Sequence, residues 1–168
     1  KTNPEAIIWA VDGVDDNSVA FAARLMEKGV EVRIIDKEAL LSKQSLSRGS
    51  IAVLAMDNPE YEDLSETVNS IATDLDISVL SIESGFGAEE LPDWGGRHFR
   101  LLERPQIAIL SQSGFSSYDV GVSWWSLDHH LGIRHSQIDA SLVNYADLRR
   151  YNTIILPSGY RDMGEYEK

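Results

Sequence analysis

The sequence predicts a three-layer α/β fold with mainly parallel sheets, built from two related half-units. Short apolar runs alternate with helical patterns, and the runs lack the polar alternation of a sheet with one face in water. In addition, a shift of 103 residues places Gly29 on Gly132 and Ile51 on Ile154 without a gap. The shared order of strand, helix and strand therefore indicates a repeat.

The first half-unit is expected over residues 1–84, with four strands from its apolar runs and two helices from its amphipathic stretches. The strands are expected at Ala6–Val11, Val30–Ile35, Ile51–Met56 and Ile77–Ile82, and the helices before Gly29 and over Tyr61–Leu75. The 15 residues from Asp36 to Ser50 separate the second and third strands. This length favours parallel strands over the hairpin of a ferredoxin-like unit.

Residues 85–104 are expected to form a linker, and residues 105–168 a second half-unit. Its strands are expected at Gln106–Leu110, Ile133–Ile138 and Thr153–Leu156, with a helix over Ser117–Leu131 that Gly132 ends. By the register of the repeat, another helix would begin near Met163. We therefore expect this half-unit to be truncated, and its open apolar surface to favour a homodimer.

A set of residues between positions 105 and 159 has a characteristic spacing. It comprises Pro105, Ala108, Leu110, Gly114, Asp119, Gly121, Trp124, Leu127, Asp147, Leu148, Tyr151, Leu156, Pro157 and Gly159. Upstream, Gly85 and the turn Trp94-Gly95-Gly96 extend the set. It resembles the class I glutamine amidotransferase-like domain in the C-terminal region of bacterial zinc carboxypeptidase proteins.

This resemblance implies a flavodoxin-like or glutamine amidotransferase-like fold, and it indicates a domain better than an activity because none of the matching motifs is catalytic. It implies a noncatalytic accessory segment of a larger zinc carboxypeptidase-like protein, in contact with the peptidase domain of the same parent chain. It further implies an extracellular or periplasmic location, no cofactor in this segment, and zinc only in the parent peptidase domain.

The formal net charge of −12 opposes binding to nucleic acid, because a phosphate backbone would be repelled. No apolar run approaches the roughly 20 residues that span a bilayer. The sequence contains no cysteine, which excludes a disulfide, a thiolate metal site and a cysteine nucleophile in this chain.

The ends of parallel strands are where such sheets bind ligands, and two polar turns follow predicted strands here. The candidate ligand-binding residues in them are Ser113, Gly114, Ser116, Ser117, Ser158 and Gly159. The first turn precedes a helix, so it either holds an anion or supplies Ser117 as a helix cap. By resemblance, the second supplies the oxyanion-hole N–H groups of an amidotransferase, whose catalytic cysteine would lie downstream.

A second hypothesis concerns four acidic residues near predicted strand ends, namely Asp12, Asp15, Asp16 and Asp57. They resemble the Mg²⁺ site and phosphoacceptor of a response-regulator receiver, and carboxylate oxygens suit Mg²⁺. Gly13 departs from that pattern, and the acidic turn is also an ordinary helix cap. The adjacent His129 and His130 diverge by ~100° on a helix, which opposes a zinc site.

Overall fold

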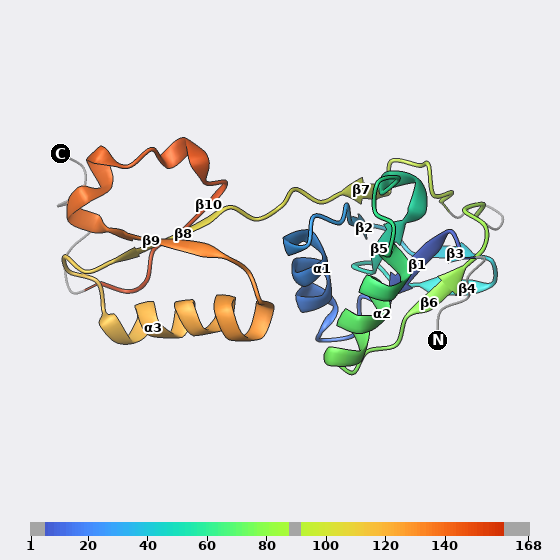
Figure 1. Cartoon of the computed structure of the whole chain (residues 1–168), viewed down its shortest axis with the longest axis horizontal. Coiled ribbons are helices and arrows are strands. Elements are labelled where there is room, and N and C mark those ends of the chain that lie inside the picture. The colour runs from blue at the N-terminus through green and yellow to red at the C-terminus, as the bar shows by residue number, and fades with distance from the viewer. Residues whose placement is uncertain (1–5, 88–91, 160–168) are drawn as a thin grey trace. The chain divides into compact units, whose positions relative to one another are not determined.

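The computed structural model describes residues 6–87 and 92–159, and the chain divides into two compact units, residues 1–104 (unit 1) and residues 105–168 (unit 2; Figure 1). The division falls between Arg104 and Pro105. Within the described ranges, no helix has the length and apolar character needed to cross a membrane.

Unit 1 is built on a five-stranded sheet in which every neighbouring pair is antiparallel. The strand order is β6-β1-β5-β2-β7, and Trp9 of β1 lies opposite Val53 of β5. The strands are β1 (Ile8–Val11), β2 (Arg33–Ile35), β5 (Ile51–Leu54), β6 (Leu80–Ile82) and β7 (Phe99–Leu101).

The prediction of a mainly parallel, flavodoxin-like fold is wrong, because the larger sheet is antiparallel throughout. Unit 1 has the order of elements of a ferredoxin-like βαββαβ unit, with a hairpin inserted between its second and third strands. The hairpin comprises β3 (Ala39–Leu41) and β4 (Gln44–Leu46). Because the hairpin folds the chain back on itself, the 15-residue connection can join two antiparallel neighbours, β2 and β5.

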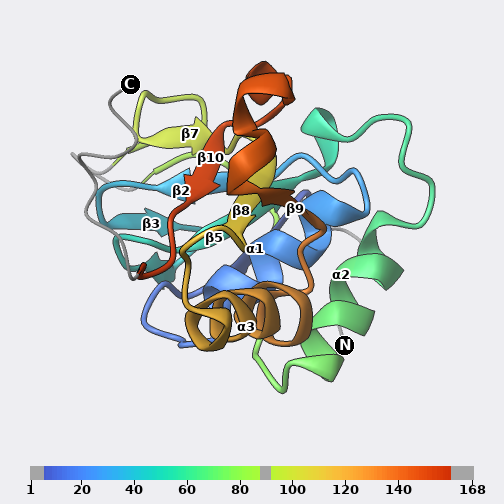
Figure 2. The same ribbon diagram turned by 90° about the vertical axis from the view of Figure 1, so that its left-hand side faces the viewer.

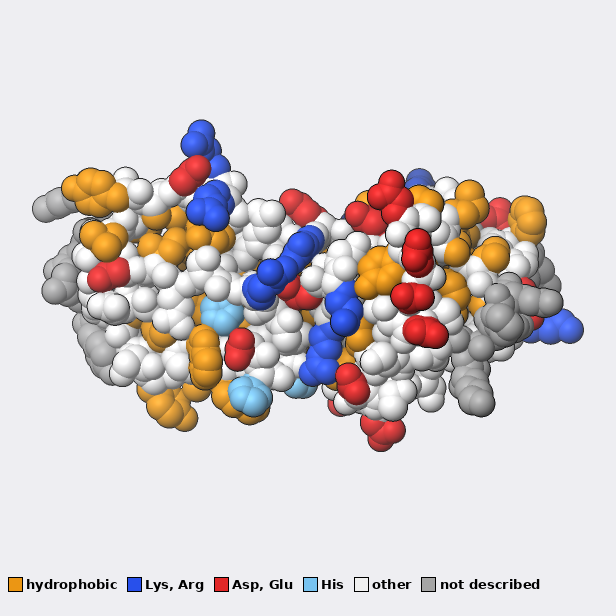
Figure 3. Space-filling model, in the orientation of Figure 1, with side chains coloured by type: hydrophobic (Ala, Val, Ile, Leu, Met, Phe, Trp, Pro, Cys, Tyr) orange, Lys and Arg blue, Asp and Glu red, His pale blue; other side chains and the backbone are white. Residues whose placement is uncertain are grey.

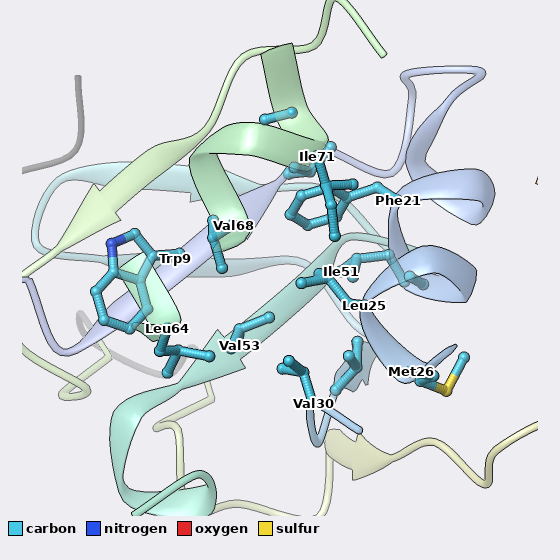
Figure 4. Packing of buried hydrophobic residues seen from close by; sticks show 14 of the residues in the cluster. Trp9, Phe21, Leu25, Met26, Val30, Ile51, Val53, Leu64, Val68 and Ile71 are labelled. Atoms are coloured by element: carbon cyan, nitrogen blue, oxygen red, sulfur yellow. The ribbon is translucent and has the colours of Figure 1, made fainter. Parts of the chain in front are cut away.

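Both faces of this sheet are covered, which explains why its strands are apolar without alternation. On one face, α1 (Ser18–Glu27) and α2 (Leu64–Asp74) direct Phe21, Leu25 and Val68 into a shared core (Figure 4). On the other, the hairpin contributes fully buried Leu41 and Leu46 to a second cluster. Burial on both faces is typical of parallel sheets, and here the hairpin provides it for an antiparallel one.

Residues 92–104, expected to be part of a linker, belong to unit 1. Phe99 begins the edge strand β7, and its ring lies 4.9 Å from that of Trp94, centroid to centroid. Both side chains are buried in the second cluster. Beyond β7, the Leu102 N–H donates to the Val32 carbonyl over 2.8 Å, which holds the chain to unit 1 almost as far as the boundary.

Unit 2 contains a three-stranded parallel sheet in the order β10-β8-β9. The strands are β8 (Ile107–Ser111), β9 (His135–Asp139) and β10 (Thr153–Ile155). Helix α3 (Ser117–Trp125) continues into a π-helical segment (Ser126–Leu131) on one side of the sheet. Two 3-10 segments (Ala140–Tyr145 and Leu148–Arg150) lie on the other side (Figures 1 and 2).

The two units are not a structural repeat. In unit 1 the second and third strands of the five-stranded sheet in chain order, β2 and β5, are antiparallel neighbours. Their expected counterparts in unit 2, β9 and β10, lie on opposite sides of β8, each parallel to it. The alignment at a shift of 103 residues therefore reflects a shared order of elements and not a shared fold. The helix expected near Met163 lies outside the described residues.

Candidate functional site

The polar residues that follow β8 and β10 meet at the carboxyl edge of the parallel sheet. Because these strands are parallel neighbours, their ends lie together. Phe115 forms a β-bridge with Gly159, and the Ser116 N–H donates to the Ser158 carbonyl over 2.8 Å. The structure thus brings the turn holding Ser113 and Gly114 close to the turn after β10.

The side chains at this edge are occupied by contacts with one another. The Ser158 hydroxyl donates to the Asp119 carboxylate, and the Ser113 hydroxyl donates to Asp139 Oδ1 over 2.9 Å. Ser116, and not Ser117, is the N-cap of α3, where its Oγ accepts from the Asp119 N–H. Ser117 lies one position inside the helix, with its side chain exposed. These contacts tie the strand ends to α3.

The electrostatics of this edge oppose an anion. Hydrogen bonds from the backbone N–H and the hydroxyl of Ser141, and then from the Ser113 hydroxyl, lower the pKa of Asp139. Asp139 is therefore ionised at neutral pH, and Asp119 adds a second carboxylate nearby. An oxyanion or phosphate at this edge would meet two acidic side chains, although the N-terminus of a helix by itself favours negative charge.

Asp57 does not lie with the other three acidic residues of the receiver hypothesis. Asp12 follows β1 and Asp57 lies just beyond β5, and since these strands are antiparallel their carboxyl ends are at opposite edges of the sheet. Asp12 Oδ1 accepts from the Val14 N–H, and Asp15 Oδ1 accepts from the Asn17 N–H, so both carboxylates stabilise the turn before α1. Asp16 belongs to this same turn.

Gly13, the departure from the receiver pattern, has a packing role instead. Its N–H donates to Ser50 Oγ over 3.0 Å, and a Cβ at this position would lie 2.3 Å from the backbone carbon of Gly49. Only glycine fits where two backbones approach this closely.

Unit 1 contains two ion-pair clusters that the sequence did not reveal. Arg33 donates through Nε to Asp57 Oδ2 over 2.6 Å and through Nη2 to Oδ1 over 3.0 Å. This pairing with Asp57 raises the pKa of Arg33. In the second cluster, the His98 ring Nδ1 lies 2.6 Å from Asp36 Oδ1, which is the main cause of the lowered pKa of Asp36. Both clusters tie β2 to its neighbours.

The outer side of α3 presents a group of residues that we call the outer stripe: Tyr118, Gly121, Val122 and Trp125. They line a shallow depression of about 370 Å³ together with Ser117. The exposed fractions are 78% for Tyr118, 50% for Val122 and 55% for Trp125. On the opposite side of the helix, Val120 is buried. This helix is therefore apolar on both sides, a pattern typical of helices covered by protein.

Helix α2 shows what the outer side of a solvated helix looks like in this chain. Its exposed residues are Glu66, Ser70, Thr73 and Asp74. Acidic side chains gather over α2, whereas hydrophobic and histidine side chains appear over α3 (Figure 3). The spacing of Tyr118, Val122 and Trp125 was readable in the sequence, but assigning it to the outer side required knowing which side faces the sheet.

In the ranges that the structure covers, no group of three or more His, Cys, Asp or Glu side chains is placed to hold a metal ion. Comparisons with protein-family models, with curated proteins and with solved structures found no match to the chain.

Proposed function

We propose that this chain is a noncatalytic accessory segment of a larger zinc carboxypeptidase-like protein, in which unit 2 serves as a protein-contact module. The observation that carries the proposal is the outer stripe, where large apolar side chains stay exposed on a helix whose other side is already buried. Solvated helices do not need such residues, and exposed apolar patches on soluble proteins mark contact sites.

The noncatalytic part of the proposal is supported by the carboxyl edge of unit 2. Catalysis of acyl transfer needs a nucleophile facing free oxyanion donors. Here the hydroxyls of Ser113 and Ser158 donate to carboxylates, and the sequence has no cysteine. The zinc carboxypeptidase-like parent, its extracellular or periplasmic location and contact with its peptidase domain come from the resemblance of residues 105–159.

An activity assay tests the noncatalytic part. The purified chain is incubated with glutamine and, separately, with peptides bearing free C-termini, with and without added Zn²⁺. We expect no product above a protein-free blank. Ammonia or amino-acid release that copurifies with the chain through a second chromatographic step contradicts the proposal.

The coding sequence that surrounds this chain tests the parent. A zinc-peptidase ligand set in the same reading frame supports the proposal, and a complete reading frame without one contradicts it. A cysteine and a histidine encoded downstream of position 168 would instead support an amidotransferase-type enzyme, completed beyond this chain.

A further inference from the structure

The outer stripe has the spacing of a helix-packing hole. Tyr118, Gly121, Val122 and Trp125 occupy positions i, i+3, i+4 and i+7 of α3. When two helices pack by knobs into holes, four residues of one helix surround a side chain of the other. The depression lined by these same residues is such a hole, so the geometry fits a side chain that projects from another helix.

Gly121 gives this hole its floor. A glycine inside a helix costs about 1 kcal/mol relative to alanine. A Cβ at Gly121 would meet no atom within 4 Å, so no steric clash within the chain requires glycine here. What the missing side chain provides is space between Tyr118 and Trp125, which allows a second helix to approach closely.

We propose that the chain forms a homodimer in which the outer stripe of α3 packs against the outer stripe of a second copy. This inference rests on the proposed function, in which unit 2 is a protein-contact module, and assigns the outer stripe of that module to a second copy of the chain. In an antiparallel pairing, Trp125 of each copy lies over Gly121 of the other.

Self-complementarity favours a second copy as the occupant. A two-fold interface requires one patch to supply both partners of every contact. The outer stripe supplies a large knob, Trp125, and a hole of matching spacing around Gly121 on the same surface.

Charge favours the same occupant. None of the four stripe residues is charged, so two stripes can meet without like charges facing each other. Residues 105–168 hold five basic and seven acidic residues, whereas residues 1–104 hold ten and twenty. Unit 2 is thus the part of the chain that a second copy approaches with less repulsion.

The area predicts a weak dimer. Tyr118 and Trp125 are the two large side chains of the stripe, and a fully buried aromatic residue contributes about 150–250 Å². Because Tyr118 is 78% and Trp125 55% exposed in the monomer, two stripes together have roughly 400–700 Å² of aromatic surface left to bury, which is below the size of a standard specific interface. We expect an equilibrium between monomer and dimer that depends on concentration.

Sedimentation velocity of the whole chain, over protein concentrations from about 1 µM to about 1 mM, tests the inference. The wild-type chain should shift from monomer toward dimer. Trp125→Ala removes the knob, and Gly121→Leu fills the hole with a good helix former whose Cβ lies in open space. Each should raise the dissociation constant at least about tenfold, the scale of a truncated interface hot spot.

Tyr118→Ala and Tyr145→Ala form a matched pair of variants. Both tyrosines belong to unit 2 and are highly exposed, 78% for Tyr118 and 88% for Tyr145, but Tyr145 lies in a 3-10 segment outside the stripe. Tyr118→Ala should weaken the dimer, and Tyr145→Ala should leave it unchanged. Far-ultraviolet circular dichroism checks that each variant is folded; if Trp125→Ala is not, Gly121→Leu decides.

Three results overturn the inference: a wild-type chain that stays monomeric at the highest concentration, a dimer that tolerates Gly121→Leu, or equal weakening by Tyr118→Ala and Tyr145→Ala. Failure here is distinguishable from failure of the proposed function. If the chain is an inactive monomer, only the dimer proposal is disproved. If the chain is a dimer that hydrolyses glutamine, only the noncatalytic assignment is disproved.

Discussion

Unit 1 covers both faces of its sheet, whereas unit 2 leaves large side chains exposed on the outer side of its only α-helix in the described range. Their charge differs in the same sense, with an excess of ten acidic residues in residues 1–104 and of two in residues 105–168. Strong net charge opposes association, and apolar surface promotes it. The difference indicates that unit 2 is better suited than unit 1 to contact another protein.

The largest expected effect is on the core of unit 1. Phe21 is completely buried between the helices and the sheet, so Phe21→Ala should destabilise unit 1 by about 3–5 kcal/mol. Val122→Ala, on the exposed outer stripe of unit 2, should change monomer stability by less than about 0.5 kcal/mol. Hydrogen exchange of the β5 amides reports unit 1, and exchange of the β8 amides reports unit 2. Comparable losses in both variants would contradict the contrast.

Two glycines should respond to alanine with opposite signs. Gly29 follows α1 with φ of +85°, a conformation that alanine adopts at a cost, so Gly29→Ala should destabilise unit 1 by about 1 kcal/mol. Gly121→Ala, inside α3 with open space around the new Cβ, should stabilise unit 2 by up to about 1 kcal/mol. Urea titrations at a concentration where the chain is monomeric measure both. A destabilising Gly121→Ala would show that α3 needs its glycine for folding.

The ion pairs of the two units should also differ. Arg33 and Asp57 have side-chain exposures of 27% and 18% and are joined by two hydrogen bonds, so a double-mutant cycle should give a coupling free energy of about 1 kcal/mol. In unit 2, the Arg149 and Asp147 side chains are 90% and 48% exposed, and their cycle should give no measurable coupling. The two cycles are compared at the same ionic strength, and equal couplings would contradict this expectation.

The smallest expected effect is a difference between the pKa values of two carboxyl groups in their response to added salt. The pKa of Asp36 is lowered chiefly by its hydrogen bond to His98, with further contributions from the charges of Arg100 and Arg48. The pKa of Asp139 is lowered by uncharged donors on Ser141 and Ser113. Added salt should therefore raise the pKa of Asp36 toward its ordinary value of 3.8 and leave that of Asp139 in place. Carboxyl-carbon NMR titrations at low and high salt measure both shifts.

The same two pKa values fix the sign of the pH dependence. A carboxyl group whose pKa is lower in the folded state stabilises the fold above the unfolded value and loses that contribution as pH falls through the folded one. Stability contributed by Asp36 and Asp139 should thus decline below about pH 4, near the ordinary carboxyl pKa. Asp36→Asn should remove the unit 1 part of this decline, and an unchanged acid profile in that variant would contradict it.

Most element positions could be predicted from the sequence, but the strand directions of unit 1 could not. The runs Ile8–Val11 and Ile51–Leu54 are buried on both faces, and continuous burial was interpreted as a parallel sheet. Strand direction could not be inferred without knowing which element covers the second face of the sheet. The covering hairpin, Ala39–Leu46, lies within a stretch that has too few apolar residues to signal strands. The length of the connection, 15 residues, did not indicate that the connection contains a hairpin.

The candidate site was also predictable only in part. The sequence placed Ser113 and Gly114 after one strand of unit 2 and Ser158 after another, and the parallel pairing of β8 with β10 brings these residues together. The hydrogen-bond partners of the hydroxyl groups could not be predicted, because Ser158 and Asp119 are 39 residues apart in the sequence. Asp12 and Asp57 were grouped on the assumption of parallel strands, and the antiparallel pairing of β1 with β5 separates them.

The edge strand β7 has a consequence for the order in which the chain is made. Its residues pair with β2, so that Arg33 meets Leu101 across 68 positions of sequence. During synthesis from the N-terminus, the outer edge of β2 therefore stays without its partner until nearly all of unit 1 has emerged. An open strand edge is a site for pairing with other nascent chains. This exposure ends only when residues 99–101 have left the ribosome and paired with β2.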